Sequence, residues 1–425
     1  MGKNNIVISK HRRKILKYFI FVFFIIPMIE VSGLTTVINR FIPNILGYNL
    51  LVFVLSLPLL RSFNKNYGNL KGTLVAITLL ITYLIITFIV TVGKTSFYAS
   101  IQVFRYSYMQ ALNLFILLPF IFSLKKDEVN YVLNGVFRCL IVFTIIYLSN
   151  NLGYDWMGVK GNLSESQGGV SVDRSIIGMP LFDPLWTSLL FVYTMMKVPN
   201  ANKYLMLILL TLLISFTRNI FFSTLIVATV VIILSVLKNH NQFGRSVKML
   251  AATLLGIVLL SVIMPSAIDF WIAKLSSTFN EDLKHDMGTF AFREQLIADA
   301  IYAIRHNPLF GLGYIRDVAK GEYSMVMGGD TYIAPILWCE GWMGIILRTL
   351  PFVVLCRESL LNLFKKKRNY WLDTIVIASI VASSVNYVQT KALTNYPLIL
   401  GIIILLKIKD NYDRKTQDFG NYSIL

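Results

Sequence analysis

Long apolar segments recur along this chain and constrain its fold more than any other feature. Of its 425 residues, 56% are hydrophobic and only 15% are charged. We expect about twelve spans, each near the roughly 20 residues that a helix needs to cross the hydrocarbon core. Their approximate centres are Phe24, Phe53, Leu80, Leu114, Phe143, Leu189, Leu209, Val227, Gly256, Leu347, Ala378 and Ile403. The sequence therefore predicts an all-α polytopic membrane protein that forms a single integral membrane domain over residues 1–425.

Basic residues between these segments predict the orientation, because Lys and Arg near span ends are retained on the cytoplasmic side. If both termini are cytoplasmic, all the basic connections fall on that side: KNNIVISKHRRK, RSFNKNYGNLK, SLKKDE, KVPNANK, KNHNQFGRSVK, RESLLNLFKKKRN and KIKDNYDRKTQ. Two long loops, residues 151–184 and 268–330, then lie outside. The net charge of +18 is thus mostly a topological signal, and we expect no nucleic-acid partner.

Several function classes find no support in the sequence. Cys139, Cys339 and Cys356 lack metal-like spacing and are interpreted as packing residues. The outer cluster Glu281, Asp282, His285 and Asp286 fits a solvated loop better than a cation site. No nucleotide-binding glycine loop or internal repeat occurs. We therefore expect neither a metal nor a cofactor, and a driving force that comes from the substrate or an ion gradient.

The larger outer loop contains an amphipathic helical pattern over residues 293–305. At 100° per residue, Arg293 falls on the same side as Ile297, Ala300, Ile301 and Ile304. An arginine on an apolar face is costly unless an anion meets it. That anion is either a bound phosphate or a carboxylate such as Asp299 or Asp330.

Further arginines lie at the predicted outer boundary. The guanidinium group suits phosphate because it is a permanently charged, planar fork. Arg218 stands in the tight turn SFTRN between two spans, where it either meets an anion or extends to the interface. Arg174 lies in SVDRSIIGMPLFDPLW, a loop that either folds back over a site or carries a solvated charge. Arg305 and Arg316 are expected to be solvated.

Two residues are candidate general bases. His306 opens HNPLFGLG, where Pro308 must end a helix and the glycines permit a tight turn. This histidine either moves protons or bonds the free carbonyls of the helix end. Asp330, in GGDTYIAPILWCEGWMG, is either a partly buried base with a raised pKa or a helix N-cap.

Charged residues also occur within a predicted span. Glu340 and Arg348 are eight residues apart, which places them about two turns apart on one face of a helix. Ionisable residues in a membrane are rare and often functional. The two side chains could therefore pair with each other or line a cavity.

In this order, the motifs resemble the membrane-embedded O-antigen polymerases of the Wzy type, which are related to the O-antigen ligases. The resemblance rests on SFTRNIFFSTLIV, on FREQLIADAIYAIRHNPLFGLGY, on the short polar loop after it, and on DTYIAPILWCEGWMGIIL. The loop with Arg174 and GMPLFDP is similar to an earlier external loop of the family. Ligases typically place a histidine where Asp330 stands, so the aspartate favours the polymerase branch.

The resemblance implies glycosyl transfer on the outer side of a bacterial cytoplasmic membrane. The growing glycan would leave polyprenyl pyrophosphate and join a hydroxyl of an incoming polyprenyl-pyrophosphate-linked unit, giving O-antigen, capsule or exopolysaccharide. In this scheme Arg218, Arg293 and Arg174 bind pyrophosphate, Asp330 accepts the proton with His306 next in rank, and Tyr314 and Tyr332 orient sugars. The expected partners are these two lipid-linked oligosaccharides, membrane lipid and a chain-length regulator protein.

Other functions stay open at this point. An O-antigen ligase would use the same donor chemistry with a different acceptor. A flippase or other transporter would also have about a dozen spans, although transporters usually gather polar residues near the midplane and often show repeated halves. No DxD sequence occurs in the predicted outer loops, which favours a metal-independent glycosyltransferase.

Overall fold

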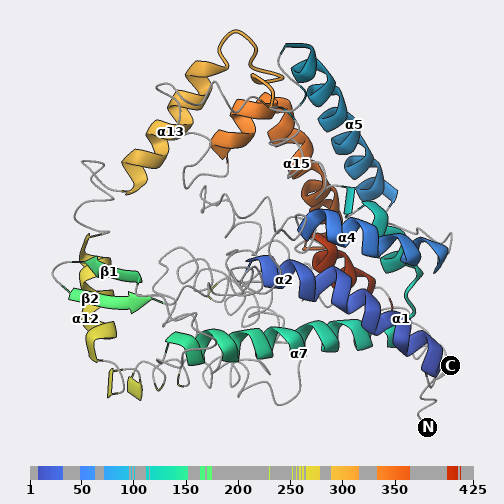
Figure 1. The fold of residues 1–425 in the computed structure, drawn as a ribbon, viewed down its shortest axis with the longest axis horizontal. Coiled ribbons are helices and arrows are strands. Elements are labelled where there is room, and N and C mark those ends of the chain that lie inside the picture. The colour runs from blue at the N-terminus through green and yellow to red at the C-terminus, as the bar shows by residue number, and fades with distance from the viewer. Residues whose placement is uncertain are drawn as a thin grey trace.

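The computed structural model describes ten stretches of the chain and a few isolated positions between them. The stretches are residues 8–31, 48–62, 71–94, 112–151 without 114, 163–167, 170–174, 265–277, 289–314, 333–363 and 400–409. Within them the chain is helical apart from one two-stranded hairpin, so the predicted helical class is confirmed with that one exception (Figure 1).

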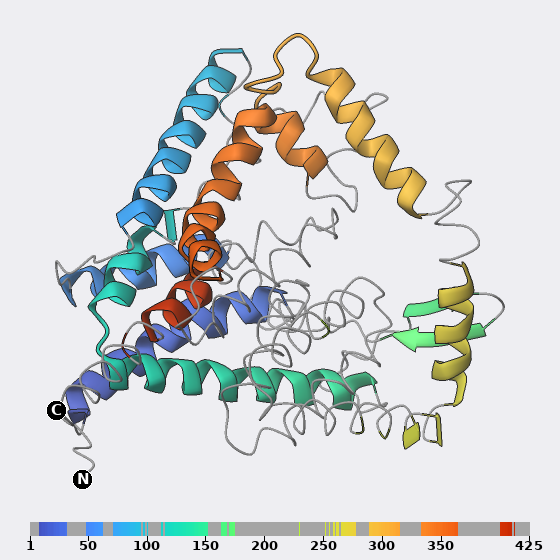
Figure 2. The same ribbon diagram turned by 180° about the vertical axis from the view of Figure 1, so that it is seen from behind.

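Helices α5 (Lys71–Lys94) and α15 (Ile333–Leu363) lie side by side along their length (Figures 1 and 2). Tyr83 of α5 contacts Glu340 of α15, and Gly72 faces Val354, so the two helices are antiparallel. The buried face of α5 carries Ala76, Ile77, Leu80 and Leu84 as well as Thr91, whose hydroxyl donates to the Thr87 carbonyl of the same helix. Its other face exposes Val75, Leu79, Ile86, Ile89 and Val90, as a lipid-facing helix requires.

Three described helices are long and apolar enough to span a membrane: Lys71–Lys94, Lys126–Ile146 and Ile333–Val354. They contain the predicted centres Leu80, Phe143 and Leu347, so these three predicted spans coincide with helices of the required length and composition. Phe24, Phe53 and Ile403 also lie in helical segments. The centres Leu114, Leu189, Leu209, Val227, Gly256 and Ala378 lie outside the described residues.

The N-terminal span is a continuous helical segment with a local change of pitch. It consists of α1 (Lys10–Ile20), the π-helical turn η1 (Phe21–Ile25) and α2 (Ile26–Val31). Pro27 has no backbone N–H, which removes one bond to the preceding turn and accounts for the wider turn before it. This segment contacts α4 (Tyr48–Ser56), which continues into the 3-10 turn η2 (Leu57–Ser62).

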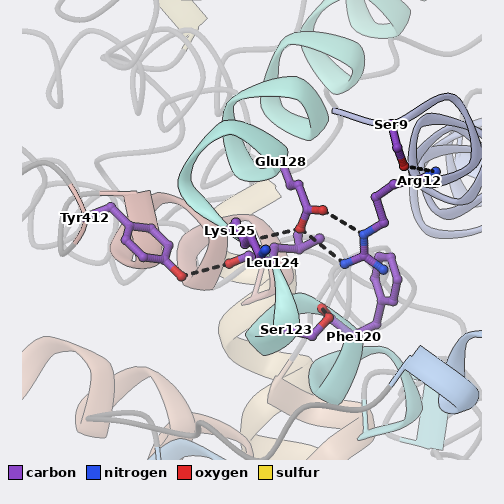
Figure 3. Close-up of polar contacts among 8 residues, drawn as sticks. All are labelled: Ser9, Arg12, Phe120, Ser123, Leu124, Lys125, Glu128 and Tyr412. Carbon is purple, nitrogen blue, oxygen red and sulfur yellow. Dashed lines mark hydrogen bonds and ion pairs between the residues drawn. The ribbon is translucent and has the colours of Figure 1, made fainter. Parts of the chain in front are cut away.

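Segments from three distant parts of the sequence meet at the start of α7 (Lys126–Asn151), as Figure 3 shows. The Arg12 guanidinium donates from Nε to Glu128 Oε1 at 2.7 Å and from Nη2 to Oε2 at 3.2 Å, and it lies over the Phe120 ring. The Tyr412 hydroxyl donates to the Leu124 carbonyl at 3.0 Å. All three segments belong to loops predicted to share one side of the membrane, and their contact agrees with that alternation.

The hairpin lies within the first predicted outer loop. Strands β1 (Leu163–Gln167) and β2 (Val170–Arg174) are antiparallel, with Leu163 opposite Arg174. Both strands contact α12 (Pro265–Ser277), which enters the second predicted outer loop (Figure 1). The two loops predicted to lie on the same side therefore touch each other.

Candidate functional site

Helix α13 (Thr289–Ala303) carries Arg293 on its buried side and contacts α15. Ala300 and Ile304 are buried and fall within about 20° of Arg293 around the helix. Leu296 is buried on the same face, whereas Ile301 is 41% exposed. Arg293 itself is half-buried. The predicted placement of Arg293 on the apolar face is therefore confirmed, with Leu296 in the place expected for Ile301.

A compact turn follows α13 and reverses the chain. Gly311 donates from its amide to the Asn307 carbonyl at 2.9 Å, and the Asn307 side-chain amide donates to the Gly311 carbonyl at 3.0 Å. Gly311 and Gly313 have φ values of 67° and 92°, which favour glycine. The predicted turn at HNPLFGLG is confirmed, because these glycines turn the chain, although the helix already ends at Ala303, before Pro308.

This turn docks into a break in α15. Gly341 has φ 62° and ψ −164°, so the ladder of i to i−4 hydrogen bonds is interrupted there. The turn supplies partners both for amides and for carbonyls that the break leaves without a bond inside the helix. The amides of Trp342 and Met343 donate to the carbonyls of Pro308 and Leu309 at 3.0 and 3.1 Å.

The carbonyls on the other side of the break are satisfied in the same way. Those of Trp338 and Cys339 accept from the amides of Leu312 and Gly313 at 2.8 and 3.1 Å. The Glu340 carbonyl accepts from the Tyr83 hydroxyl at 2.5 Å. A helix break inside a membrane protein is tolerated only where other groups satisfy the freed backbone in this manner.

A buried ionic cluster lies directly beside the break. Arg348 donates from Nε to Glu340 Oε2 at 2.8 Å and from Nη2 to Oε1 at 2.5 Å, and both side chains are only 2% exposed. The Tyr314 hydroxyl donates to Glu340 Oε1 at 2.9 Å, and the Tyr314 amide donates to Thr91 Oγ1 at 3.1 Å. Glu340 and Arg348 therefore pair, which settles the alternative that the sequence left open.

Tyr314, predicted to orient sugars, and His306, predicted to transfer protons, differ sharply in exposure. Tyr314 is completely buried, so its ring and hydroxyl contact protein. His306 is exposed on the turn, and its Nε2 accepts from Arg305 Nε at 3.1 Å. Arg305 is exposed as expected and lies 4.0 Å from the centroid of the Tyr302 ring. The catalytic role of His306 and the sugar-binding role of Tyr314 stay predictions.

The other candidates are described in part or lie outside the described residues. Arg174 ends β2, next to α12, and only its backbone is described. Arg218, Asp330, Tyr332 and the acidic cluster at 281–286 lie outside the described residues. Helix α13 with Arg293 thus leads directly into the turn with His306 and Tyr314, and both α13 and this turn contact α15.

One cation near the hairpin was not singled out in the sequence. Lys274 of α12 is 6% exposed, and its Nζ lies 4.9 Å from the centroid of the Phe270 ring. A separation of four residues on a helix brings an aromatic ring and a cation together. The four-residue spacing of Phe270 and Lys274 was the sequence signal for this contact. It bears on the candidate site only because α12 packs against the hairpin that contains Arg174.

In a comparison with known protein families, one family model matches part of this chain. Residues 204–334 match the family model described as O-antigen ligase (Wzy_C). Six of the seven candidate residues fall in this stretch, which excludes only Arg174 and ends before Glu340 and Arg348. Searches of curated proteins and of solved structures found no match.

Residues 204–334 are thus similar to a family of membrane glycosyltransferase-like proteins that act in polysaccharide and lipopolysaccharide biosynthesis, and three of the described helices are long and apolar enough to span a membrane. The family implies lipid-linked oligosaccharide substrates within the membrane. The chain carries an O-antigen ligase-type domain at residues 204–334, which confirms the predicted resemblance to the Wzy-type and O-antigen ligase family.

Proposed function

We propose that this protein polymerises lipid-linked oligosaccharide repeat units on the outer face of a bacterial cytoplasmic membrane. The growing glycan leaves one polyprenyl pyrophosphate and is transferred to the non-reducing-end hydroxyl of a second lipid-linked unit. The observation that carries the proposal is Arg293, which lies on the buried face of α13 within the matched domain. A permanent cation on that face fits an anionic leaving group.

The reaction balances without an added oxidant or reductant. The bond between the anomeric carbon and the pyrophosphate oxygen breaks, and the same carbon forms a bond to the acceptor oxygen. The acceptor proton passes to a base, for which Asp330 is the first candidate and His306 the second. The leaving polyprenyl pyrophosphate gains negative charge, which Arg293, Arg218 and Arg174 stabilise because their charge is fixed in place beforehand.

The polymerase is preferred over a ligase because of the aspartate at position 330, where ligases typically have a histidine. The polymerase is preferred over a transporter because Arg174 and Arg293 lie in the two predicted outer loops and Arg218 in a predicted outer turn, rather than on a repeated pair of broken helices. Both alternatives predict products that differ from those of a polymerase, so one experiment separates all three.

The experiment measures the polysaccharide ladder of cells in which the native copy is deleted and replaced at matched membrane abundance. Wild type should restore long chains, whereas Arg293→Ala should lower the polymerisation rate by about 10²- to 10³-fold, as loss of one preorganised donor does. Arg293→Lys should recover only part of the rate, because an ammonium group lacks the planar fork.

A matched control is Arg13→Ala, which removes the same charge from an exposed position of α1 and should leave the ladder unchanged. Two results in the deletion strain would overturn the proposal. Lipid-linked polymer that stays unattached would identify a ligase. Repeat units that accumulate on the cytoplasmic face would identify a transporter.

A further inference from the structure

We propose that Tyr314 and the Glu340–Arg348 ion pair are positioning residues that set the location of Arg293, an inference that rests on the proposed function. None of the three side chains has appreciable exposed surface, so none is placed to touch substrate. They act through α13, which leads directly into the turn that ends at Tyr314.

Tyr314 joins two separate segments, the turn after α13 and helix α15. Arg348 already contacts both oxygens of Glu340, with Nε on Oε2 and Nη2 on Oε1. The carboxylate therefore does not need Tyr314 to be satisfied. The additional bond from the Tyr314 hydroxyl, at 2.9 Å, fastens the end of the turn to α15.

The hydrogen bond between Tyr314 and Glu340 has little freedom to shift. The turn and the α15 break exchange four backbone hydrogen bonds, from the amides of Leu312, Gly313, Trp342 and Met343. A Cβ on Gly311 would lie 2.7 Å from the Gly341 amide nitrogen, so the two backbones are already in close contact. The Tyr314 amide also donates to Thr91 of α5, which holds the turn against a second helix.

Helix α13 transmits a movement of the turn to Arg293. Arg293 lies ten residues before Ala303, the last residue of α13, or about 15 Å along the helix. A tilt of about 5° at the turn would therefore move the Arg293 backbone by roughly 1 Å. A misplacement of roughly 1 Å is enough to lower the rate of an enzyme by up to about 100-fold.

The test variant is Tyr314→Phe, which removes one hydroxyl and retains both the aromatic ring and the Glu340–Arg348 pair. Its matched control is Tyr18→Phe, which deletes the phenol that donates to the Leu55 carbonyl at 2.6 Å, in a contact between α1 and α4. Each variant is made in the full-length chain, both with Arg293 and with Arg293→Ala, in membranes of equal protein content.

The measurement is the initial rate at which these membranes elongate the lipid-linked repeat units that accumulate in the deletion strain. Tyr314→Phe should lower the maximal rate about tenfold and leave the half-saturating concentration within about twofold of wild type. In the Arg293→Ala background it should change the residual rate by less than about twofold, because the residue through which it acts is gone. Tyr18→Phe should match its parent in both backgrounds.

Three outcomes would overturn the positioning role. An equal loss in both backgrounds would mean that Tyr314 only supports the fold. A raised half-saturating concentration with an unchanged maximal rate would mean that its hydroxyl binds sugar. A wild-type rate for Tyr314→Phe would mean that the bond does not matter. By contrast, wild-type membranes that fail to elongate the units would refute the proposed function itself.

Discussion

Two arginine–glutamate pairs among the described residues differ mainly in their access to water. The Arg12–Glu128 pair joins α1 to α7, with side chains 24% and 9% exposed. The Arg348–Glu340 pair lies beside the break in α15, with both side chains 2% exposed. In both, the guanidinium contacts the two oxygens of one carboxylate.

The difference in exposure predicts different energetic roles. An accessible pair exchanges contacts with water at little net gain and is weakened by salt. A buried pair contributes little over an apolar pair of the same size, yet removal of one partner leaves an uncompensated charge. The pair at the α15 break should therefore be costly to disturb and easy to replace as a unit.

The largest effect is expected from Arg348→Met, which leaves the Glu340 carboxylate buried without its cation. We expect a loss of about 3–5 kcal/mol in the free energy of unfolding. The measurement is the unfolding midpoint of the purified protein in lipid nanodiscs. The matched variant Glu340→Met with Arg348→Met should regain most of this stability, since both charges are then absent.

The double variant also separates stability from activity. It restores the fold but removes the acceptor for Tyr314, so it should unfold near the wild-type midpoint and still elongate glycans slowly. A double variant as unstable as Arg348→Met would contradict the view that the unpaired charge is the source of the cost.

The second-largest effect should come from Gly341→Ala at the α15 break. Gly341 has φ 62° and ψ −164°, a backbone region that is essentially restricted to glycine and costs other residues roughly 1–3 kcal/mol. The new Cβ would also lie 2.5 Å from the Leu309 carbonyl oxygen and 2.6 Å from the Gly311 amide nitrogen, both backbone atoms. The unfolding midpoint should fall, and the polysaccharide ladder should shorten because the turn is displaced.

The control for this variant is Gly93→Ala in α5, whose Cβ would meet nothing within 4 Å. Alanine in a helix is more favourable than glycine by roughly 0.5–1 kcal/mol, so this variant should unfold at the same or a higher temperature. If both glycine variants behaved alike, close backbone contact at the break would not be the reason for Gly341.

The features that sequence periodicity predicted are those within one helix. The side of α13 that carries Arg293 follows from 100° per residue and was recognisable because it depends on the regular geometry of a single element. The separation of eight between Glu340 and Arg348 made pairing only one of two alternatives. Their contact occurs across the break at Gly341, because eight residues of regular helix would separate them by about 12 Å along its axis.

The features that sequence missed depend on contacts between elements. The break at Gly341 interrupts the same regular geometry, and nothing local shows that the HNPLFGLGY turn, about thirty residues earlier, supplies its missing partners. The sequence assigned Tyr314 a sugar-orienting role and gave no sign that docking of the turn buries this residue completely. Tertiary contacts of this kind override local expectation.

The smallest effect is expected at the accessible pair, where Arg12→Gln should lower the free energy of unfolding by about 0.2–1 kcal/mol. The Phe120 ring beneath the guanidinium places the loss toward the upper part of that range, because the ring also loses a cation. The Glu128 carboxylate still accepts from the Lys125 amide at 2.9 Å, so the start of α7 keeps its cap.

Salt provides the sharper test of this comparison. Screening shortens from about 8 Å at 0.15 M to about 3 Å at 1 M ionic strength, so the gap between wild type and Arg12→Gln should narrow as salt is added. The gap between wild type and Arg348→Met should not narrow, because ions do not reach side chains that are 2% exposed. Equal salt dependence of the two gaps would show that water reaches both pairs, and the argument that assigns them different roles would fail.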